Sequence, residues 1–587
     1  MEELKDLLIK IIEDSLSRLN YIFDIEEIKA NFQESDSLNF GDYSLPCFFL
    51  SKKNIKNPNE IALKLGKEIE KEIKKDKNLR EKIEKIEIKN SYINFFINKK
   101  ELAFNLINEI EKKKEDYGKE NLGKNNKTMV EFPSPNTNKP LHLGHLRNLS
   151  IGESVSRILE FYNEKVIRAN LYNDRGVHIC KSMLAYQKFK DELENNSENI
   201  KNKKDKEKIK SDHFVGDLYV LFSKKAKENP ELEKQAQEML VKWEQGDKEI
   251  RELWKKLNSM AITGIKETIS LFNVKHDKEY FESNIYEKGR EIILEGLKNG
   301  IFKKENDNSI YIDLTNKGLG KKYLLRNDGT SIYITQDIYL SKLKFDEFKI
   351  NKSIYVVGNE QEYHFKVLFS ILDKLKLLKK ENLYHLSYGM VNLPDGKMKS
   401  REGTVVDADD LIDETKELVK EELKKRYILD EKEIERRSLI IALSAIKYML
   451  LKTNIKRDIT FNPKESIAFE GDTGPYLLYS YARANSILKK IKKLPEFKIK
   501  DLKDEEIKLL LKINEFKKTL NESYKTLNPS LIANYAYQLS KIFNEFYHAC
   551  PVINSENEDF RLHLVLAFKQ ILKISLYLLN IEVLEEM

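Results

Sequence analysis

One stretch of the chain, residues 128–162, constrains the fold strongly because a strand, a turn and a helix follow one another within it. Thr128–Phe132 is short and apolar, with the β-branched content of a buried strand, and Pro133 and Pro135 prevent the strand from continuing. Turn-forming residues occupy positions 136–140. The apolar residues that follow recur at helical spacing: Leu146, Leu149, Val155, Ile158, Leu159 and Tyr162. This pattern predicts a strand that leads through a short loop into a helix.

The tetrad His-Leu-Gly-His at positions 142–145 lies at the predicted start of this helix. A helix N-terminus carries unpaired backbone N–H groups and a partial positive charge, so it favours phosphate binding. His142 and His145 lie on one side of the first turn, where both can donate hydrogen bonds to a phosphoryl group. Gly144 leaves room for a ligand to approach closely. The bland alternative is that the two histidines are only polar caps, since such a tetrad is easily met by chance.

Further strands predict a parallel sheet. Val166–Tyr172 follows the first helix as a second strand, and Ile354–Val357 is another buried strand that precedes a helix from about residue 362. Strand, helix and strand at this spacing indicate an α/β domain. Residues 323–326 and 331–335 flank Asn-Asp-Gly and therefore predict a hairpin, with Tyr333 on its second arm.

Length and composition exclude several classes of protein. A chain of 587 residues is long for one hydrophobic core and predicts roughly three or four domains. The net charge of +7 is compatible with a nucleic-acid partner but does not establish one. Cys47, Cys180 and Cys550 lie far apart, so we expect neither a disulfide framework nor a zinc site. With no signal peptide and no long apolar run, the sequence predicts a cytoplasmic protein that does not contact a membrane.

The patterns change along the chain and predict five regions. Residues 1–112 suggest a small α+β domain, with an amphipathic helix at the start and a strand within Ile86–Ile97. The lysine-rich residues 113–127 suggest a linker. The Rossmann-like α/β domain then covers 128–405, with a helical insertion around 185–310, and the helical remainder is divided into a connecting region at 406–460 and a bundle at 461–587.

The string EFPSPNTNKPLHLGHLR, residues 131–147, resembles the HIGH signature of class I aminoacyl-tRNA synthetases in its arginyl-tRNA synthetase form. The resemblance implies that His142, Gly144 and His145 bind ATP. It also implies that the two histidines stabilise the transition state at the α-phosphate. These roles agree with the physical argument from the helix N-terminus.

An arginine pocket needs acceptors held rigidly around a planar cation that has five donors. Taken singly, Glu131 could instead pair with a nearby lysine and Asp337 could cap a helix. The resemblance implies a set of arginine-binding residues that this sequence fills with the expected types: Glu131, Ser134, Asn136, Tyr333, Asp337 and Gln361.

A second string, residues 396–403, resembles the KMSKS loop of the same family. Lys397, Met398 and Ser400 are implied in ATP binding, and mobile cations in such a loop could neutralise charge as pyrophosphate leaves. Ser400 stands where the second lysine is usual, while Lys399 comes one place early. In arginyl enzymes a lysine upstream of the HIGH tetrad is thought to substitute, and Lys139 stands there. We therefore expect Lys139, Lys397 and Lys399 to serve as phosphate cations.

Both ends of the chain resemble tRNA-contacting domains of this family. Aromatic side chains and arginines can stack on splayed RNA bases, although many of them pack in protein cores. Gly471–Arg483 and the helices after it are similar to the anticodon-binding bundle, while the N-terminal region is similar to the additional domain that contacts the outer corner of tRNA. The implied tRNA-binding residues are Tyr476, Tyr479, Arg483, Phe40 and Asn94.

The sequence thus predicts an enzyme, an arginine–tRNA ligase whose partners are tRNA(Arg), L-arginine and ATP with Mg²⁺, with no metal held by the protein itself and a monomeric state. Three alternatives remain open. A small-substrate adenylyltransferase would not need the terminal domains, and a catalytically silent tRNA-binding relative would have lost a histidine of the tetrad or Lys397. Another class I synthetase would lack the set Glu131, Asp337 and Gln361.

Overall fold

The computed structural model describes residues 2–35, 40–200, 209–330, 332–394 and 406–587. Two compact units make up the chain. Unit 1 comprises residues 1–117, 487–516 and 541–571, and unit 2 comprises residues 118–486, 517–540 and 572–587. The chain therefore crosses from one unit to the other several times within its C-terminal helices.

The core of unit 2 is a parallel five-stranded sheet with the order β12-β11-β5-β6-β7, as the sequence predicted. In the centre, β5 pairs with β11 on one side and β6 on the other, which places Glu131 opposite both Tyr355 and Ala169. The strands are β5 (Lys127–Glu131), β6 (Lys165–Tyr172), β7 (Lys278–Phe281), β11 (Lys352–Gly358) and β12 (Leu383–Tyr388).

The predicted strand-to-helix stretch is confirmed, with α7 at Leu143–Phe161 following β5. Both faces of β5 are buried, and most of α7 is buried as well, so the two elements fix the loop between them. Gly152 allows α7 to approach Phe132, because a Cβ there would lie 2.3 Å from the phenylalanine ring. The tetrad at 142–145 is therefore held at the carboxyl edge of the sheet by packing on either side.

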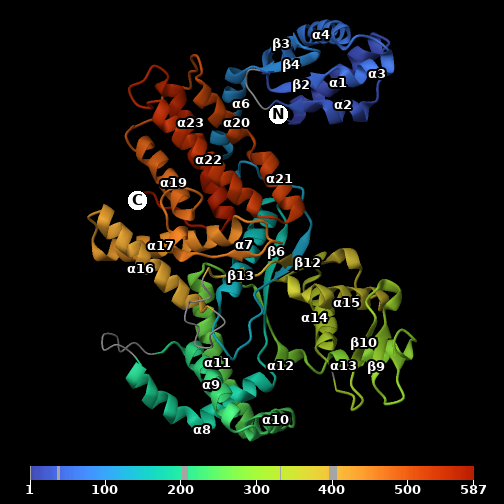
Figure 1. Ribbon diagram of the computed structural model, residues 1–587, viewed down its shortest axis with the longest axis vertical. Helices are drawn as coiled ribbons and strands as arrows, with labels where there is room; N and C mark the ends of the chain where they lie inside the picture. Colours follow the sequence, from blue (N-terminus) through green and yellow to red (C-terminus); the bar gives the residue numbers. More distant parts are fainter. Residues whose placement is uncertain (1, 36–39, 201–208, 331, 395–405) are drawn as a thin grey trace. The chain divides into compact units, whose positions relative to one another are not determined.

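A second group of elements in unit 2 combines α13, α14, α15 and a small antiparallel sheet of order β10-β9-β8 (Figure 1). The predicted hairpin is wrong: β10 pairs with β9, and the chain turns at 327–329 into helix α14. Buried Ile334, Ile338 and Ser341 recur at helical spacing, which explains why these residues form a helix. The elements are β8 (Lys303–Lys304), β9 (Ile310–Asp313), β10 (Lys321–Leu325), α13 (Gly289–Lys298), α14 (Tyr333–Phe348) and α15 (Glu362–Lys374).

The predicted insertion is helical over α8 to α11, and the apolar core of these helices includes Trp243 and Phe222. Its predicted bounds of about 185–310 were too wide, because β7 and β8 within them belong to the five-stranded and three-stranded sheets. Residues 201–208, a lysine-rich part of the insertion, lie outside the described residues. After these helices the chain forms β7, the edge strand of the five-stranded sheet, and a short helix, α12 (Glu282–Ile285), then leads to α13. The long helices are α8 (Val177–Ile200), α9 (Ser211–Glu228), α10 (Glu231–Glu244) and α11 (Lys248–Leu271).

After residue 406 the described chain is helical apart from the two-residue strand β14 and the connecting loops, as predicted. A pair of two-residue strands, β13 (Val391–Asn392) and β14 (Ile459–Thr460), joins the helical region to the sheet region within unit 2. The chain breaks at Glu515, which separates α20 from α21. The helices are α16 (Ala408–Arg426), α17 (Glu431–Leu451), α18 (Pro463–Ser466), α19 (Gly474–Leu488), α20 (Asp504–Asn514), α21 (Phe516–Thr526), α22 (Ser530–Ala549) and α23 (Glu558–Leu578).

Unit 1 contains the predicted small α+β fold, an antiparallel sheet of order β1-β2-β4-β3 with helices packed against it. The single strand predicted within 86–97 is two strands, because Asn90 and Ser91 adopt positive φ angles of 50° and 68° and reverse the chain. The elements are α1 (Glu2–Arg18), α2 (Ile25–Asn31), β1 (Gln33–Glu34), β2 (Tyr43–Pro46), α3 (Phe48–Asn54), α4 (Pro58–Lys75), α5 (Lys77–Lys82), β3 (Ile83–Lys89), β4 (Tyr92–Ile97) and α6 (Lys99–Lys113).

Candidate active site

A cavity of about 1010 Å³ lies in unit 2 where β5, β11 and β12 end. The carboxyl ends of parallel strands are the usual ligand-binding edge of such a sheet. Glu131, Gly358 and Tyr388, each the last residue of its strand, all line the cavity. The structure brings together in it nine of the residues that the sequence singled out: Glu131, Ser134, Asn136, His142, Gly144, His145, Tyr333, Asp337 and Gln361.

The two histidines of the tetrad lie against one another, with 3.7 Å between their ring centroids. The backbone N–H of His142 donates to Nδ1 of His145 over 3.1 Å, which places the proton of a neutral His145 ring on Nε2. Burial lowers the pKa of His142 to about 4, and the charge of Lys139 acts in the same direction. Burial, His142 and Lys139 together lower the pKa of His145 well below its usual value. Both rings are therefore neutral donors at physiological pH.

Gly144 lies between the two histidines in the sequence, and the ring of His142 limits the space beside it. A Cβ at this position would lie 3.0 Å from Cε1 of His142, so a side chain would press on the imidazole. The turn is also tied to the residues that precede α16, because the Leu143 N–H donates to Val406 O and the Ala408 N–H donates to Leu141 O. The backbone of the tetrad is thus fixed from both sides.

Helix α14 supplies one wall of the cavity with residues spaced along a single face. Tyr333 is 65% exposed, and Asp337 follows it one turn later. Nε2 of His364, on α15, lies 2.8 Å from Oδ2 of Asp337 and orients that carboxylate. Gln361 lies at the start of α15 and is exposed. The helix, and not a strand as predicted, therefore presents the Tyr-x-x-x-Asp pair to the cavity.

Glu131 forms an ion pair with the buried ammonium of Lys344, which also belongs to α14. The alternative partner that the sequence left open for Glu131, a nearby lysine, is therefore present. The carboxylate still lines the cavity. Ser134 and Asn136 lie in the loop after β5. The Ser134 N–H donates to the side-chain oxygen of Asn170 on β6, and the backbone of Asn136 forms an isolated β-bridge with that of Asn173, just after β6.

Sequence reasoning missed Glu282, a buried carboxyl that also lines the cavity. Burial raises its pKa to about 7, against the opposing charge of Arg175. Its Oε2 has no hydrogen-bond partner among the described residues. A signal was available, because Glu282 directly follows β7 and so lies at the same sheet edge as Glu131.

Arg147, two residues after the tetrad, was not assigned a role from the sequence but is fully buried. Its guanidinium donates to four backbone carbonyls, at 2.6 Å to Gly389, 3.0 Å to Met390, 3.1 Å to Ile455 and 2.8 Å to Arg457. Burial lowers its pKa to about 10. Arg147 therefore links α7 to the segment that contains Gly389 and Met390, and Met390 lines the cavity.

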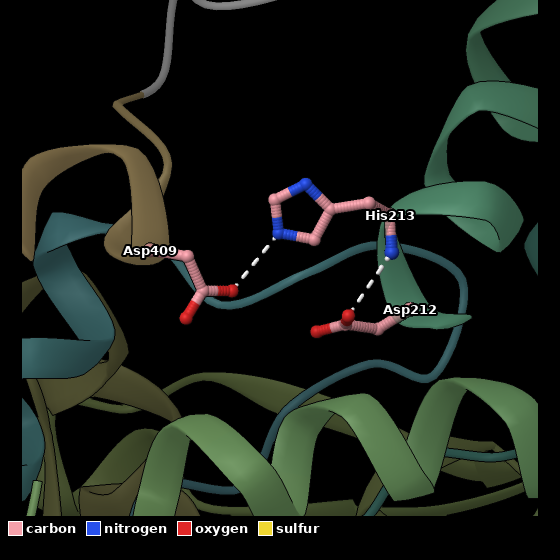
Figure 2. Close-up of side chains that lie close together, drawn as sticks. All are labelled: Asp212, His213 and Asp409. Carbon is pink, nitrogen blue, oxygen red and sulfur yellow. Dashed lines mark hydrogen bonds and ion pairs between the residues drawn. The ribbon is translucent and has the colours of Figure 1, made fainter. Parts of the chain in front are cut away.

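Asp212, His213 and Asp409 form a cluster that joins α9 to α16 (Figure 2). Nε2 of His213 lies 2.9 Å from Oδ2 of Asp409, and Lys210 Nζ lies 2.7 Å from the same oxygen and 3.5 Å from Asp212. These side chains could hold a metal ion, but Lys210 already places a cation among the carboxylates. Next to the cluster, the backbone of Asp407 forms an isolated antiparallel β-bridge with the backbone of His142. We interpret the cluster as a structural link between the insertion and the tetrad.

The predicted ATP-binding loop lies outside the described residues, so nothing tests the predictions for Lys397, Met398, Lys399 and Ser400. Lys139 is half-buried, and its charge acts on both histidines of the tetrad, although it is not among the residues that line the cavity.

The predicted tRNA-binding residues fall in both units. In unit 2, Tyr476, Tyr479 and Arg483 lie on α19, where Arg483 donates to the Tyr479 hydroxyl over 2.8 Å. In unit 1, Phe40 and Asn94 line a second cavity of about 550 Å³. Phe40 is 50% exposed, whereas Asn94 is buried and accepts a hydrogen bond from Ser44.

Three family models match the chain in succession. The first is described as the arginyl tRNA synthetase N-terminal domain and matches residues 6–97. The second, tRNA synthetases class I (R), catalytic domain, matches residues 106–463, and the third, the DALR anticodon binding domain, matches residues 477–587. In the part of the chain that is described, no helix combines the length and apolar character needed to cross a membrane.

Similar proteins cover the chain from end to end. An arginine–tRNA ligase of Treponema denticola is 44% identical over 100% of both chains, and one of Phocaeicola vulgatus is 45% identical over 82% of this chain and 84% of its own. Arginyl-tRNA synthetase structures from Thermus thermophilus and Plasmodium falciparum share the fold, with TM-scores of 0.74 and 0.73 at 23% identity. Each covers 100% of this chain, which covers 100% and 99% of theirs.

Proposed function

Because the chain belongs to the arginyl-tRNA synthetases, the class I ligases that charge tRNA with arginine, we propose that it carries out both steps of that reaction in the unit 2 cavity. The observation that supports this assignment is the shared lining: the His-Leu-Gly-His turn and the carboxylates Glu131 and Asp337 line the same cavity. ATP, amino acid and tRNA are its substrates.

In the first step, a carboxylate oxygen of arginine attacks the α-phosphorus of ATP. The bond to the bridging oxygen of the β-phosphate breaks, and pyrophosphate leaves with the electron pair. We assign to Nε2–H of His145, and to a ring N–H of His142, the task of donating to the phosphoryl oxygens as charge builds on them. Neutral rings suit this role because they donate without titrating near pH 7.

The step needs no protein nucleophile, so positioning and electrostatics supply the catalysis. Lys139, Lys397 and Lys399 remain our proposed cations for the leaving phosphates. Mg²⁺ would arrive bound to the phosphates of ATP, since Lys210 already balances the acidic cluster nearest the tetrad. In the second step a hydroxyl of the terminal ribose of tRNA attacks the arginyl carbonyl carbon, and AMP leaves.

Recognition of arginine is assigned to Asp337, Tyr333 and Gln361, together with Glu131, Ser134 and Asn136. Asp337 is oriented by His364 and is partly open to the cavity, so it is suited to accept from two guanidinium nitrogens. A pocket that saturates a donor array leaves buried acceptors unpaired when lysine enters, and such polar discrimination reaches about 10⁴ to 10⁵.

Binding of tRNA is assigned to both units. Residues 1–112 would contact the outer corner of the tRNA, where the half-exposed ring of Phe40 could stack on a base and Asn94 could read its edge. Residues 461–587 would bind the anticodon through Tyr476, Tyr479 and Arg483, with 406–460 as the connecting region. We propose that the protein works as a monomer in the cytoplasm.

Charging of total tRNA with each of the twenty labelled amino acids tests the proposed function. Arginine alone should be attached, in an ATP-dependent reaction that is lost in His145→Ala. The variant is the matched control, because it shows that the activity belongs to this chain and not to a contaminant. Charging with another amino acid would identify a different synthetase, and tRNA binding without charging would indicate a silent relative.

A further inference from the structure

Helix α14 places a lysine at the inner end of the proposed arginine slot. Tyr333, Asp337, Ser341 and Lys344 follow one another on one face of the helix, and all four line the cavity. Exposure falls along this face, from 65% at Tyr333 to a fully buried side chain at Lys344. Lys344 therefore marks the end of the slot that is farthest from solvent.

The ammonium of Lys344 is held by groups from two neighbouring strands. It forms an ion pair with Glu131 at the end of β5 and lies 4.3 Å from the ring centroid of Tyr355 on β11. Glu131 and Tyr355 are register partners in the sheet, so they form a ready site for a cation. The Tyr355 hydroxyl is in turn hydrogen-bonded to Ser341 at 3.0 Å. The position of Lys344 is thus determined by helix and sheet together.

The carboxyl groups that line the slot differ in their cationic partners, and Lys344 is one of those partners. Glu131 is balanced by Lys344, and Glu282, which burial pushes towards its protonated form, lies under the influence of Arg175. Among the described residues, the single side chain within ion-pair distance of Asp337 is the imidazole of His364. Glu360 also lines the cavity but is exposed, which leaves Asp337 and the lysine-paired Glu131 as the sheltered carboxylates available to one substrate guanidinium. Without Lys344, two carboxylates would face one cation in a poorly solvated space, and one of them would stay uncompensated.

We propose that Lys344 is a positioning residue for arginine recognition, which keeps Glu131 ionised and orients it as an acceptor in the slot. This inference rests on the proposed function, because it assumes that Glu131 and Asp337 bind arginine. Lys344 acts through Glu131 and does not itself touch the substrate. The slot therefore contains a built-in cation that sets its charge before arginine binds.

Replacing Lys344 with methionine removes the charge while keeping a long apolar side chain. Without its cation the buried carboxylate of Glu131 is an uncompensated charge, so in this variant it should bind a proton more readily and lose an acceptor. The KM for arginine should rise on the order of tenfold at pH 7 and fall again as pH is raised, with a smaller change in the KM for ATP. Lys344→Arg should keep the wild-type pH profile, as should Lys342→Met, an exposed lysine of the same helix.

A double-mutant cycle with Glu131→Gln decides between this role and others. Since both substitutions act on one charge, Lys344→Met/Glu131→Gln should have the same arginine KM as Glu131→Gln alone, with no pH trend. Additive losses would overturn the proposal, because they would mean that Lys344 acts independently of Glu131. An unchanged arginine KM in Glu131→Gln itself would instead refute the proposed role of Glu131 in binding.

The cycle also remains decisive if one variant folds poorly. Removing one member of a buried ion pair is strongly destabilising, whereas removing both is often tolerated. If Lys344→Met does not fold, the double variant should still fold and match Glu131→Gln in arginine KM. A double variant that also fails to fold would show that Lys344 is needed for the fold without Glu131, and the proposal would be wrong.

Discussion

Substitution of Arg147 by methionine should destabilise unit 2 by an amount that can be worked out from its four acceptors. The carbonyls of Ile455 and Met390 each accept a second hydrogen bond, from the N–H groups of Gly389 and Ile459. In the described part of the chain, the carbonyls of Gly389 and Arg457 depend on the guanidinium. A buried acceptor left unpaired costs about 1–3 kcal/mol, which gives about 2–6 kcal/mol for the two.

The net loss of stability should be smaller than the upper part of that range, because the methionine variant no longer buries a charged guanidinium. The lowered pKa of Arg147 shows that burial of this guanidinium is itself unfavourable. We therefore expect a net loss of about 2 kcal/mol in the free energy of unfolding, which lies at the low end of the range. A matched control is Arg436→Met on α17, an exposed arginine whose ion pair with Glu433 should contribute less than about 1 kcal/mol.

Urea unfolding followed by tryptophan fluorescence measures this loss in the correct unit. The chain has 2 tryptophans, Trp243 and Trp254, and both belong to unit 2. The midpoint should fall in Arg147→Met with little change in the slope of the transition. Pyrophosphate exchange should weaken too, since Met390 lines the cavity. A midpoint in Arg147→Met no lower than that of Arg436→Met would refute the reasoning.

The other predictions concern the site and its histidines. His142→Ala should abolish most amino-acid activation while leaving tRNA binding nearly intact, and equal pyrophosphate exchange in the variant would exclude its phosphate role. Asp337→Ala should raise the arginine KM strongly with a smaller change for ATP, which steady-state kinetics would reveal; an unchanged arginine KM would remove Asp337 from the pocket. The pKa values of His142, His178 and His276 are lowered by burial to about 4, so the unfolded chain binds protons first as pH falls below about 6.5. The contribution of each neutral imidazole to stability should be complete above that pH and decline towards pH 4, by about 2 kcal/mol at pH 5. His276→Gln should flatten this pH dependence of unfolding, and an unaltered slope would contradict the assignment.

Much of the site could be predicted because its signals are local. The β5 strand, the prolines after it and the apolar spacing of α7 lie in one short stretch, so periodicity and turn chemistry suffice to place the tetrad at a helix start. The residues of the proposed arginine slot came from the resemblance to the family, and the chemistry of a guanidinium explains why acceptors are needed there. The hairpin prediction failed for a tertiary reason. Asn-Asp-Gly does open a turn, but the burial of Ile334 and Ile338 against the neighbouring helices makes the next segment a helix and not a strand.

The sequence by itself determined the kinds of local structure and the chemical groups available, because strand and helix periods and caps depend on residues a few positions apart. Only the tertiary structure decided which charges meet. Lys344 lies far from Glu131 in the chain, and Arg147 is equally remote from the carbonyls of Gly389 and Arg457. The energy of a buried charge depends on every group packed around it, and that surrounding exists only after helix and sheet have come together.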